Sequence, residues 1–246
     1  NLLRRCTETA ATSVVLDQRS KRLLLDACRP ADVRSLPNMV DVAALDAVLG
    51  DPDGTDEMAG DAGEPGPPMI VYVGHVLPSK GVSDLVDACR ETGAALRLDV
   101  VGPYAEFYRR ELDDRSGSKV TLTFHGTLSH EAALRVVRRS DVFALPSHSE
   151  GFPNVVAEAM ACGRAVLVTD VGAMREMIAA DGPEPCGICV AAKHVPALAA
   201  ALRHLIEDAG MRAEMGSRGR KRAETEYAAP VVTTRLVKLW QDVAGR

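Results

Sequence analysis

The sequence is poor in aromatic residues and has no excess of positive charge. Aromatic side chains make up 4% of the 246 residues, too few for a platform on which the bases of a single-stranded nucleic acid could stack. The 29 Lys and Arg residues are outnumbered by 34 Asp and Glu residues, which gives a net charge of −5. A negative balance disfavours binding to a phosphate backbone. The two shortages together argue against a nucleic-acid-binding protein.

Long apolar runs are also absent, so the sequence predicts no membrane-spanning helix, which requires about 18 or more apolar residues. The charged segment around Arg4, Arg5 and Glu8 does not have the form of a secretory signal. Because the chain starts with Asn1 rather than Met, we interpret it as a piece of a longer chain. With 46% apolar and 26% charged residues, a cytoplasmic enzyme or binding domain is the remaining class.

The six cysteines do not form a disulfide framework, and only Cys186 and Cys189 are close enough in sequence for a metal or redox pair. His194 follows nearby, but a four-ligand zinc site needs a second pair at a comparable spacing, which the sequence lacks. We therefore interpret Cys186 as a turn residue and Cys189 as a strand residue, both reduced.

Residues 50–68 interrupt the apolar pattern. They contain six carboxylates, five glycines, four prolines and no basic residue, which predicts a solvated surface loop. Asp51 and Asp53 resemble the start of a calcium-binding loop, but Asp56 stands where such a loop requires glycine. The calcium interpretation is therefore rejected.

After this segment, short apolar runs rich in β-branched residues alternate with helical patterns. Strands are predicted at residues 69–73, 96–101, 120–124, 142–145, 165–168 and 188–190. Ser79 is the predicted N-cap of a helix that ends near Gly93, and Ser129 caps a second helix. Further helices are predicted at 196–207, 211–226 and 231–243. The alternation predicts an α/β fold with a doubly wound, Rossmann-like parallel sheet.

The first 49 residues form a smaller pattern, with a strand at 13–16, a helix at 19–28 and a strand at 32–36. One strand–helix–strand unit cannot bury a core alone. We therefore interpret it as the end of another domain.

The first segment that could bind a ligand is the loop from Gly74 to Gly81, directly after the strand at 69–73. Gly74 lets the backbone approach a ligand closely, and Lys80 places an ammonium group beside the free N–H groups of a helix start, which suits a phosphate. Ser79 precedes Lys80, so the order is not that of a Walker loop. A solvated lysine at a helix start is the alternative.

The second segment follows the strand at 142–145 and contains Glu150 and Glu158. Pro153 suits a first helical position, and the N–H groups of that helix start can hold an anion. A carboxylate is a natural acceptor for the vicinal hydroxyls of a ribose or another sugar. The alternative is a helix-start Glu followed by an exposed helical Glu.

The joint pattern resembles the retaining GT-B glycosyltransferases, particularly glycosyltransferase family 4. Glu150-x7-Glu158 within SEGFPNVVAEAMACG is similar to the E-x7-E signature of that family, and the loop from Gly74 to Lys80-Gly81 is similar to its phosphate loop. The segment Leu36-Pro37-Asn38-Met39-Val40-Asp41 resembles its crossover between domains. The resemblance extends from about residue 12 to the end of the chain.

The resemblance implies a role for each matching residue. Lys80 would neutralise the donor diphosphate, Glu150 would hold the hydroxyls of the donor sugar, and Glu158 would hold the ribose. His75 stands where the family has Arg, and Leu128 stands where the family packs the base. The implied catalytic residues are Lys80 and Glu150, and the implied donor-binding residues are Gly74, His75, Lys80, Leu128, Glu150, Gly151, Phe152, Pro153, Asn154 and Glu158.

The resemblance also implies the organisation and the partners. Residues 1–40 would be a remnant of an N-terminal acceptor domain with the crossover, 41–68 a linker, 69–230 the nucleotide-sugar-binding domain, and 231–246 a helix returning to the N-terminal domain. The chain would be the donor-binding half, in the C-terminal part of a GT-B fold, of an enzyme that transfers a sugar with retention to a carbohydrate or lipid-linked acceptor. We expect no cofactor and no metal ion, since Lys80 and two helix N-termini can stabilise the leaving diphosphate.

We expect this half to be cytoplasmic, with any contact to the inner face of a membrane made through the missing half. Two other functions stay open at this point. One is a non-catalytic nucleotide-sugar-binding subunit that requires a separate acceptor-domain chain. The other is a different GT-B enzyme, such as a hydrolase, an epimerase or a phosphorylase.

Overall fold

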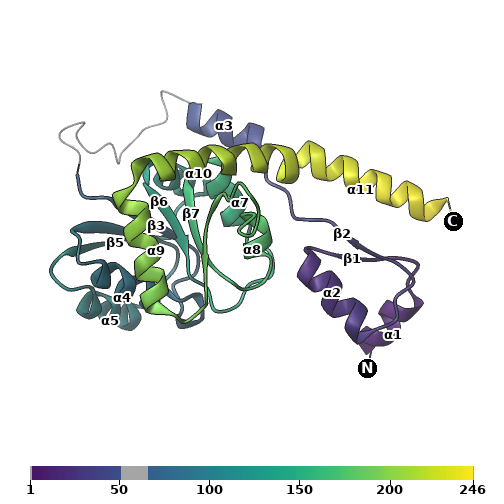
Figure 1. The fold of residues 1–246 in the computed structure, drawn as a ribbon, viewed down its shortest axis with the longest axis horizontal. Helices are drawn as coiled ribbons and strands as arrows, with labels where there is room; N and C mark the ends of the chain where they lie inside the picture. Colours follow the sequence, from purple (N-terminus) through teal and green to yellow (C-terminus); the bar gives the residue numbers. More distant parts are fainter. Residues whose placement is uncertain (1, 51–65, 246) are drawn as a thin grey trace.

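The computed structural model describes residues 2–50 and 66–245, and Figure 1 shows a helix-flanked sheet with a small unit beside it. The strands are β1 (Ser13–Val15), β2 (Val33–Ser35), β3 (Met69–Val73), β4 (Leu96–Val101), β5 (Val120–Gly126), β6 (Val142–Leu145), β7 (Ala165–Thr169) and β8 (Gly187–Val190). The helices are α1 (Leu2–Thr9), α2 (Gln18–Ala27), α3 (Val42–Gly50), α4 (Val82–Thr92), α5 (Glu106–Ser116), α6 (His130–Arg139), α7 (Asn154–Ala161), α8 (Met174–Met177), α9 (Val195–Glu207), α10 (Ala209–Arg222) and α11 (Ala229–Ala244), with a 3₁₀ turn η1 (Pro78–Lys80) and a π-helical turn η2 (Ala223–Tyr227).

The larger sheet has the strand order β5-β4-β3-β6-β7-β8, and every neighbouring pair is parallel. The chain builds this sheet outward from β3 to β5, then returns to add β6, β7 and β8 on the other side of β3. β3 and β6 are therefore neighbours from which the chain continues in opposite directions, which is the switch point where open parallel sheets bind ligands. The predicted doubly wound, Rossmann-like α/β fold is confirmed.

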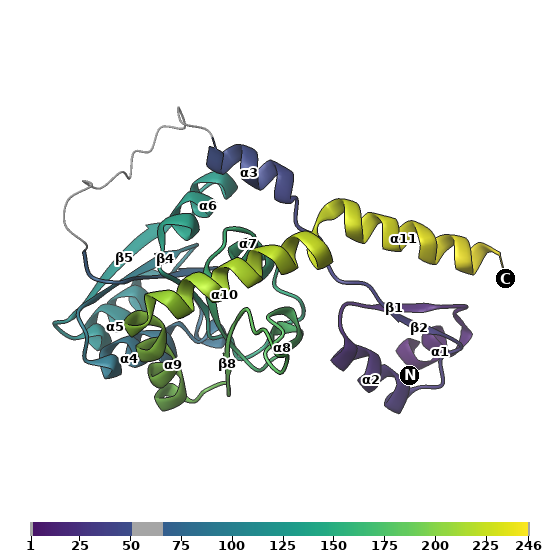
Figure 2. The same cartoon turned by 45° about the horizontal axis from the view of Figure 1, so that its top comes forward.

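Helices cover both faces of this sheet (Figure 2). α4 contacts α5 and α9, whereas α6 contacts α7 and α3. Right-handed crossovers place the first group on one face and the second group on the other. Tyr72, Leu98 and Phe143 in the strands between them are completely buried. Burial on both faces explains the near-continuous apolar sequence of the strands, and all six predicted strands form with ends that differ by no more than two residues.

The start of α4 corrects one prediction. Ser79 is not an N-cap, because Pro78, Ser79 and Lys80 form the 3₁₀ turn η1 and the helix begins only at Val82. Gly81 lies between the two elements with φ 67°, a left-handed conformation that separates them and that glycine adopts without strain. The other predicted cap is confirmed, since the Ser129 hydroxyl accepts a hydrogen bond from the N–H of Ala132 at 3.2 Å.

Part of the segment predicted as a linker is helical. α3 begins after Asp41, whose carboxylate accepts a hydrogen bond from the N–H of Ala44 at 2.9 Å. Leu45 is buried in the core, which ties this helix to the main domain. The predicted acidic loop, including Asp51, Asp53 and Asp56, lies outside the described residues except at its two ends.

The N-terminal unit has the predicted strand–helix–strand arrangement, preceded by α1, which the sequence analysis did not predict. β1 pairs with β2 in parallel, and Asp17 caps α2 by accepting a hydrogen bond from the N–H of Ser20 at 2.7 Å. Several large apolar side chains are exposed on this unit and on α11, namely Val14, Leu16, Leu23, Leu25, Val237 and Trp240. Figures 1 and 2 both show the two elements on the same side of the main domain.

Helices within the described ranges are either too short or too polar to cross a bilayer.

One carboxylate in the larger sheet is completely buried. Asp99 in β4 forms a hydrogen-bonded ion pair with Arg97, and His125 Nε2 in β5 lies 2.6 Å from its Oδ2. These residues share one face of the β4–β5 pair, since successive side chains on a strand point to opposite faces. A buried carboxylate is tolerated because these partners satisfy it.

We expect Asp99→Ala to lower the free energy of unfolding by about 3 kcal/mol, because it leaves two polar side chains without their buried partner. Chemical denaturation followed by circular dichroism measures the change. Asp113→Ala is the matched control, since this carboxylate is 45% exposed and meets Arg109 only at 3.7 Å. Equal effects of the two substitutions would show that the buried cluster contributes nothing of its own.

Candidate functional site

The loops that follow β3 and β6 meet at the switch point of the sheet. The first loop runs from Gly74 to Gly81, and a Cβ at Gly81 would overlap the carbonyl oxygen of Pro146 in the second loop. The N–H of His148 donates a hydrogen bond to the carbonyl of Ser79 at 3.0 Å. Glycine at position 81 therefore permits a close approach that joins the two predicted segments into one site.

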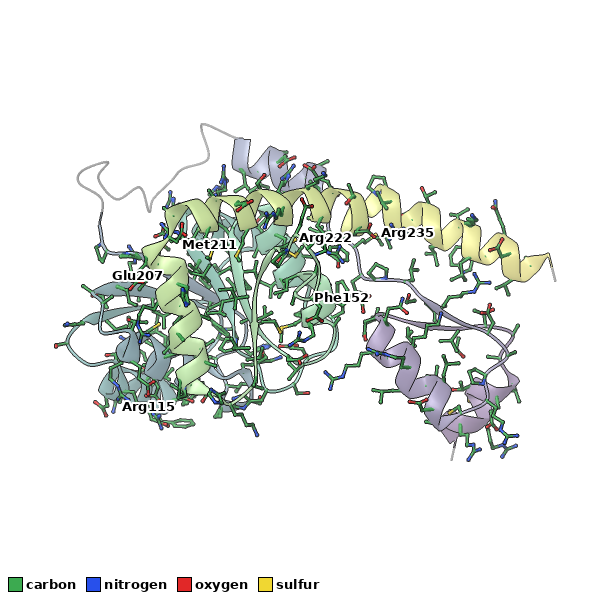
Figure 3. The ribbon with its side chains drawn as sticks, in the orientation of Figure 1. Arg115, Phe152, Glu207, Met211, Arg222 and Arg235 are labelled. Atoms are coloured by element: carbon green, nitrogen blue, oxygen red, sulfur yellow. The ribbon has the colours of Figure 1, made fainter. Side chains whose placement is uncertain are left out.

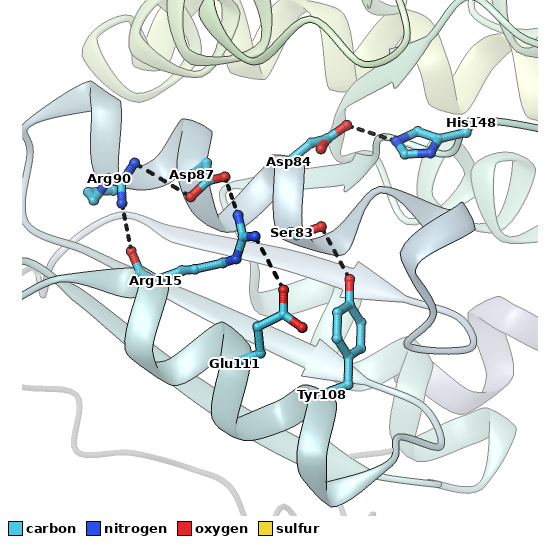
Figure 4. Close-up of polar contacts among 8 residues, drawn as sticks. All are labelled: Ser83, Asp84, Asp87, Arg90, Tyr108, Glu111, Arg115 and His148. Atoms are coloured by element: carbon cyan, nitrogen blue, oxygen red, sulfur yellow. Dashed lines mark hydrogen bonds and ion pairs between the residues drawn. The ribbon is translucent and has the colours of Figure 1, made fainter.

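A side-chain contact reinforces this junction. His148 Nε2 lies 2.8 Å from a carboxylate oxygen of Asp84 in the first turn of α4 (Figure 4). Neither His148 nor Asp84 was predicted as a site residue. In the sequence, only their positions could have indicated a role in the site, since each lies in one of the two loop–helix segments that follow β3 and β6.

The two predicted catalytic residues contact each other across the junction. Lys80 Nζ lies 2.7 Å from Glu150 Oε1, and the Ser147 hydroxyl donates to the same oxygen at 2.8 Å. The side chains of Lys80 and Glu150 are 27% and 14% exposed, so the pair is partly shielded from water but remains open to a ligand. An anion that binds Lys80 here competes with Glu150 for its charge.

The start of α7 supplies main-chain donors beside this pair. Pro153 is the N-cap and Asn154 the first helical residue, so the prediction of Pro153 at the first helical position is off by one. Pro153 also has no N–H, which leaves Gly151, Phe152 and Asn154 as main-chain donors in the predicted segment. None of these three N–H groups donates to another described residue, so all three are available to an anion.

The Phe152 side chain itself belongs to the core. It is 9% exposed and packs edge-on against Tyr227, with 5.6 Å between the ring centroids. Figure 3 places it where the main domain meets the chain leading to the N-terminal unit. Asn38 from the crossover donates to the side chain of Asn154 at 3.0 Å. Because the Phe152 side chain is buried, only the main-chain N–H of this predicted site residue can contact a ligand.

Glu158 lies one turn into α7, and His130 Nε2 at the start of α6 is 3.1 Å from its Oε1. The His130 side chain is 64% exposed and was not predicted as a site residue.

Leu128 is half-buried in the loop between β5 and α6 and packs against the core. His75 is exposed, and its carbonyl accepts a hydrogen bond from the Tyr72 hydroxyl at 2.7 Å. Gly74, which precedes His75, has a positive backbone φ angle of 153°.

A cavity of about 650 Å³ opens between α2 of the N-terminal unit and the loop between β7 and α8. Glu176 accepts a hydrogen bond from the N–H of Gln18 at 2.8 Å across it. Arg19, Arg22 and Arg175 also line this cavity. It lies at the same edge of the sheet as the switch point, because β7 ends there.

The cysteine pair has no ligand geometry. Cys186 precedes β8 and Cys189 lies within it, as predicted, and burial raises the pKa of Cys189 to about 11. His194 caps α9 by accepting a hydrogen bond from the N–H of Ala197 at 3.0 Å. In the described part of the chain, no three His, Cys, Asp or Glu side chains gather as a metal ion would require.

The sequence from residue 55 to residue 222 matches the model of the family described as glycosyl transferases group 1. The chain belongs to this family.

Among curated relatives, the D-inositol 3-phosphate glycosyltransferase of Nocardia farcinica is 34% identical over 165 residues, which cover 63% of this chain and 36% of that protein. The glycogen synthase of Mycobacterium tuberculosis is 28% identical over 181 residues, covering 71% of this chain and 42% of that one. The chain thus spans well under half the length of these two glycosyltransferases.

Solved structures show the same fold. The sucrose-phosphate synthase of Thermosynechococcus elongatus superposes with a TM-score of 0.77 at 24% identity, over 99% of this chain and 61% of that chain. Anabaena Alr3699/HepE in complex with UDP and glucose gives 0.74 at 17% identity, over 98% of this chain and 66% of that one. The fold is accordingly that of GT-B glycosyltransferases, as the resemblance implied.

Replacing Gly81 tests the junction of the two loops. We expect Gly81→Ala to lower the free energy of unfolding by about 3 kcal/mol or more, since a left-handed backbone and a clash with main chain act together. Gly93→Ala is the matched control, because Gly93 has φ 72° but no atom lies within 4 Å of the position that a Cβ would take there. It should cost only about 1 kcal/mol. Denaturant titration of both variants compares them, and equal losses would contradict a tight junction.

Proposed function

We propose that this chain is the donor-binding half of a retaining, nucleotide-sugar-dependent glycosyltransferase of family 4. The observation that carries the proposal is that Lys80, Glu150 and the free N–H groups at and just before the start of α7 come together at the switch point of the sheet. This arrangement offers a cation and main-chain donors to a diphosphate, and carboxylates to sugar hydroxyls. Membership of the group 1 family supports it.

The proposed chemistry rests on stabilising the leaving diphosphate. As the bond between the anomeric carbon and the phosphate oxygen breaks, negative charge develops on the diphosphate, and Lys80 with the α7 N–H groups would stabilise it in place. On donor binding, Glu150 would give up its contact with Lys80 and accept hydrogen bonds from the hydroxyls of the donor sugar. Glu158 would hold the ribose. His75 would add a charge beside the diphosphate only when protonated.

Retention follows, in this proposal, from a reaction on one face of the sugar. Glu150 is held by Lys80 and Ser147 rather than free as a nucleophile. We propose instead that the acceptor hydroxyl attacks from the side that the diphosphate leaves, and that a departing phosphate oxygen takes its proton. No metal ion and no further cofactor is needed for this scheme.

The acceptor would bind to the missing part of the N-terminal domain and reach the donor across the cavity beside α2. The exposed apolar side chains of α11 and of the N-terminal unit support a partner domain, since Trp240 is 62% exposed and Leu23 is 61% exposed. The acceptor class is a carbohydrate or a lipid-linked saccharide. We propose a cytoplasmic location, with membrane contact only through that other part.

Ligand binding and product analysis test the proposed function. Nucleoside diphosphates and their sugars, starting with UDP and UDP-glucose, should raise the melting temperature of the chain because they bind only the folded state. With the complete protein and an acceptor, nuclear magnetic resonance should show the anomeric configuration of the donor kept in the product. An inverted product would refute retention, and an epimerised or phosphorylated sugar would point to another GT-B enzyme.

We expect Lys80→Ala to weaken UDP binding roughly 10- to 100-fold in isothermal titration calorimetry, because one charge-assisted contact to phosphate is lost. Glu150→Gln is the informative comparison. It frees Lys80 from its ion pair, so UDP should bind at least as tightly as to the parent chain, whereas the added affinity for the sugar of the donor should disappear. Unchanged UDP affinity in Lys80→Ala would remove Lys80 from the site.

We expect donor binding to be independent of divalent cations, because Lys80 and the α7 N–H groups would meet the charge of the diphosphate. Calorimetry with UDP in excess EDTA, and again with added Mg²⁺ or Mn²⁺, measures this directly. Loss of binding in EDTA with recovery on adding either ion would contradict the proposal.

A further inference from the structure

A second cavity, of about 470 Å³, lies at the amino-terminal edge of the sheet, away from the candidate donor site. It is formed where α3, the end of α6, the end of α7 and α10 come together; in Figure 2, α3 lies beside α6 at the top of the domain and α10 crosses in front of it. The turn from α7 into β7, which contains Gly163 and Arg164, forms part of its wall. Since β7 begins here and ends at the switch point, the two sites lie at opposite edges.

Three arginines line this cavity, and within residues 2–50 and 66–245 only one of them pairs with a carboxylate. Arg220 binds the carboxylate of Asp46 through two nitrogens at 2.7 Å each and that of Glu224 at 2.6 Å. Arg138 and Arg164 contact no carboxylate of residues 2–50 or 66–245; they donate only to main-chain carbonyls. Among the described residues of the lining, Asp46 is the single acidic one, and it is already engaged.

The two unneutralised guanidinium groups are held together. Both donate to the carbonyl of Cys162, Arg138 at 3.4 Å and Arg164 at 3.3 Å, and Arg164 donates also to the carbonyl of Ser140 at 3.2 Å. Burial and the neighbouring charge of Arg138 lower the pKa of Arg164. Two like charges kept in proximity gain most from an anion placed between them.

The remaining donors suit a tetrahedral oxyanion. Each guanidinium has five N–H donors, and these contacts use one of them in Arg138 and two in Arg164. Ser217, whose side chain carries a hydroxyl group, also lines the cavity. Arginine pairs bind phosphate oxygens with well-directed, charge-assisted hydrogen bonds.

We propose that this cavity binds the phosphate group of a small phosphorylated molecule, through Arg138, Arg164 and Ser217, at a site separate from the donor site. The volume of about 470 Å³ leaves room beside the phosphate group for an organic part, and we take a phosphorylated sugar as the ligand class. This inference does not depend on the proposed function, because it uses none of the residues at the switch point.

Calorimetric titration of the full chain with glucose 6-phosphate and with inorganic phosphate tests the proposal. Arg138→Gln should weaken binding of glucose 6-phosphate at least about tenfold, because a charge-assisted contact is lost. Its only hydrogen bond within the described residues is a long one, so the fold should be kept, and an unchanged denaturation midpoint in circular dichroism confirms an intact domain. Lys80→Ala should leave glucose 6-phosphate binding unchanged, which separates this cavity from the diphosphate loop.

Arg110→Gln is the matched control, since it removes the same charge from a side chain that is 77% exposed on α5. It should have no effect on binding. Tighter binding of glucose 6-phosphate than of inorganic phosphate supports the sugar phosphate class, whereas equal affinities would reduce the ligand to phosphate alone and overturn that class. Equal binding by the parent chain and Arg138→Gln, or equal losses in Arg138→Gln and Arg110→Gln, overturns the site itself.

Discussion

The close approach of two loops at the switch point is the constraint on which the candidate site depends. Gly81 has no side chain, so the main chain after β3 can lie against the carbonyl of Pro146 after β6. That approach brings Lys80 within 2.7 Å of Glu150, although 70 positions separate them in sequence. A larger residue at position 81 would separate the loops, and the cation would lose its place beside the carboxylate and the start of α7.

The sheet could be predicted from the sequence because its strands are buried on both faces and therefore apolar throughout. That its strands run parallel followed from the strand–helix alternation, whereas their order is known only from the structure. The start of α4 could not be predicted, because Ser79 has a good capping side chain, but the left-handed Gly81 after it sets where the helix begins. The helix α3 was not predicted either. Its support comes from contacts with α6 and α7, which lie far away in sequence.

Among the site residues, the pairing of Lys80 with Glu150 was implicit in the two motifs, since both follow strands that a doubly wound sheet brings together. The direction of the Phe152 side chain could not be predicted. The sequence alone does not distinguish a loop side chain that contacts a ligand from one that packs into the core. His130 and His148 were missed because each contacts its carboxylate partner only in the folded chain, at separations of 28 and 64 positions.

The short helix α7 connects the two ends of the domain electrostatically. Its amino terminus lies directly after the loop that carries Glu150, where its dipole favours an anion. Its last carbonyls lie at the other edge, where Arg220 donates to Ala161, and Arg138 and Arg164 donate to Cys162. Cations at the carboxyl end of a helix stabilise it, so these arginines already serve the fold. Arg220 is balanced by Asp46 and Glu224, whereas Arg138 and Arg164 bring more positive charge than a helix end of about half an elementary charge can offset. Within the described residues this leaves an excess of positive charge at this edge, which the proposed phosphate group would neutralise.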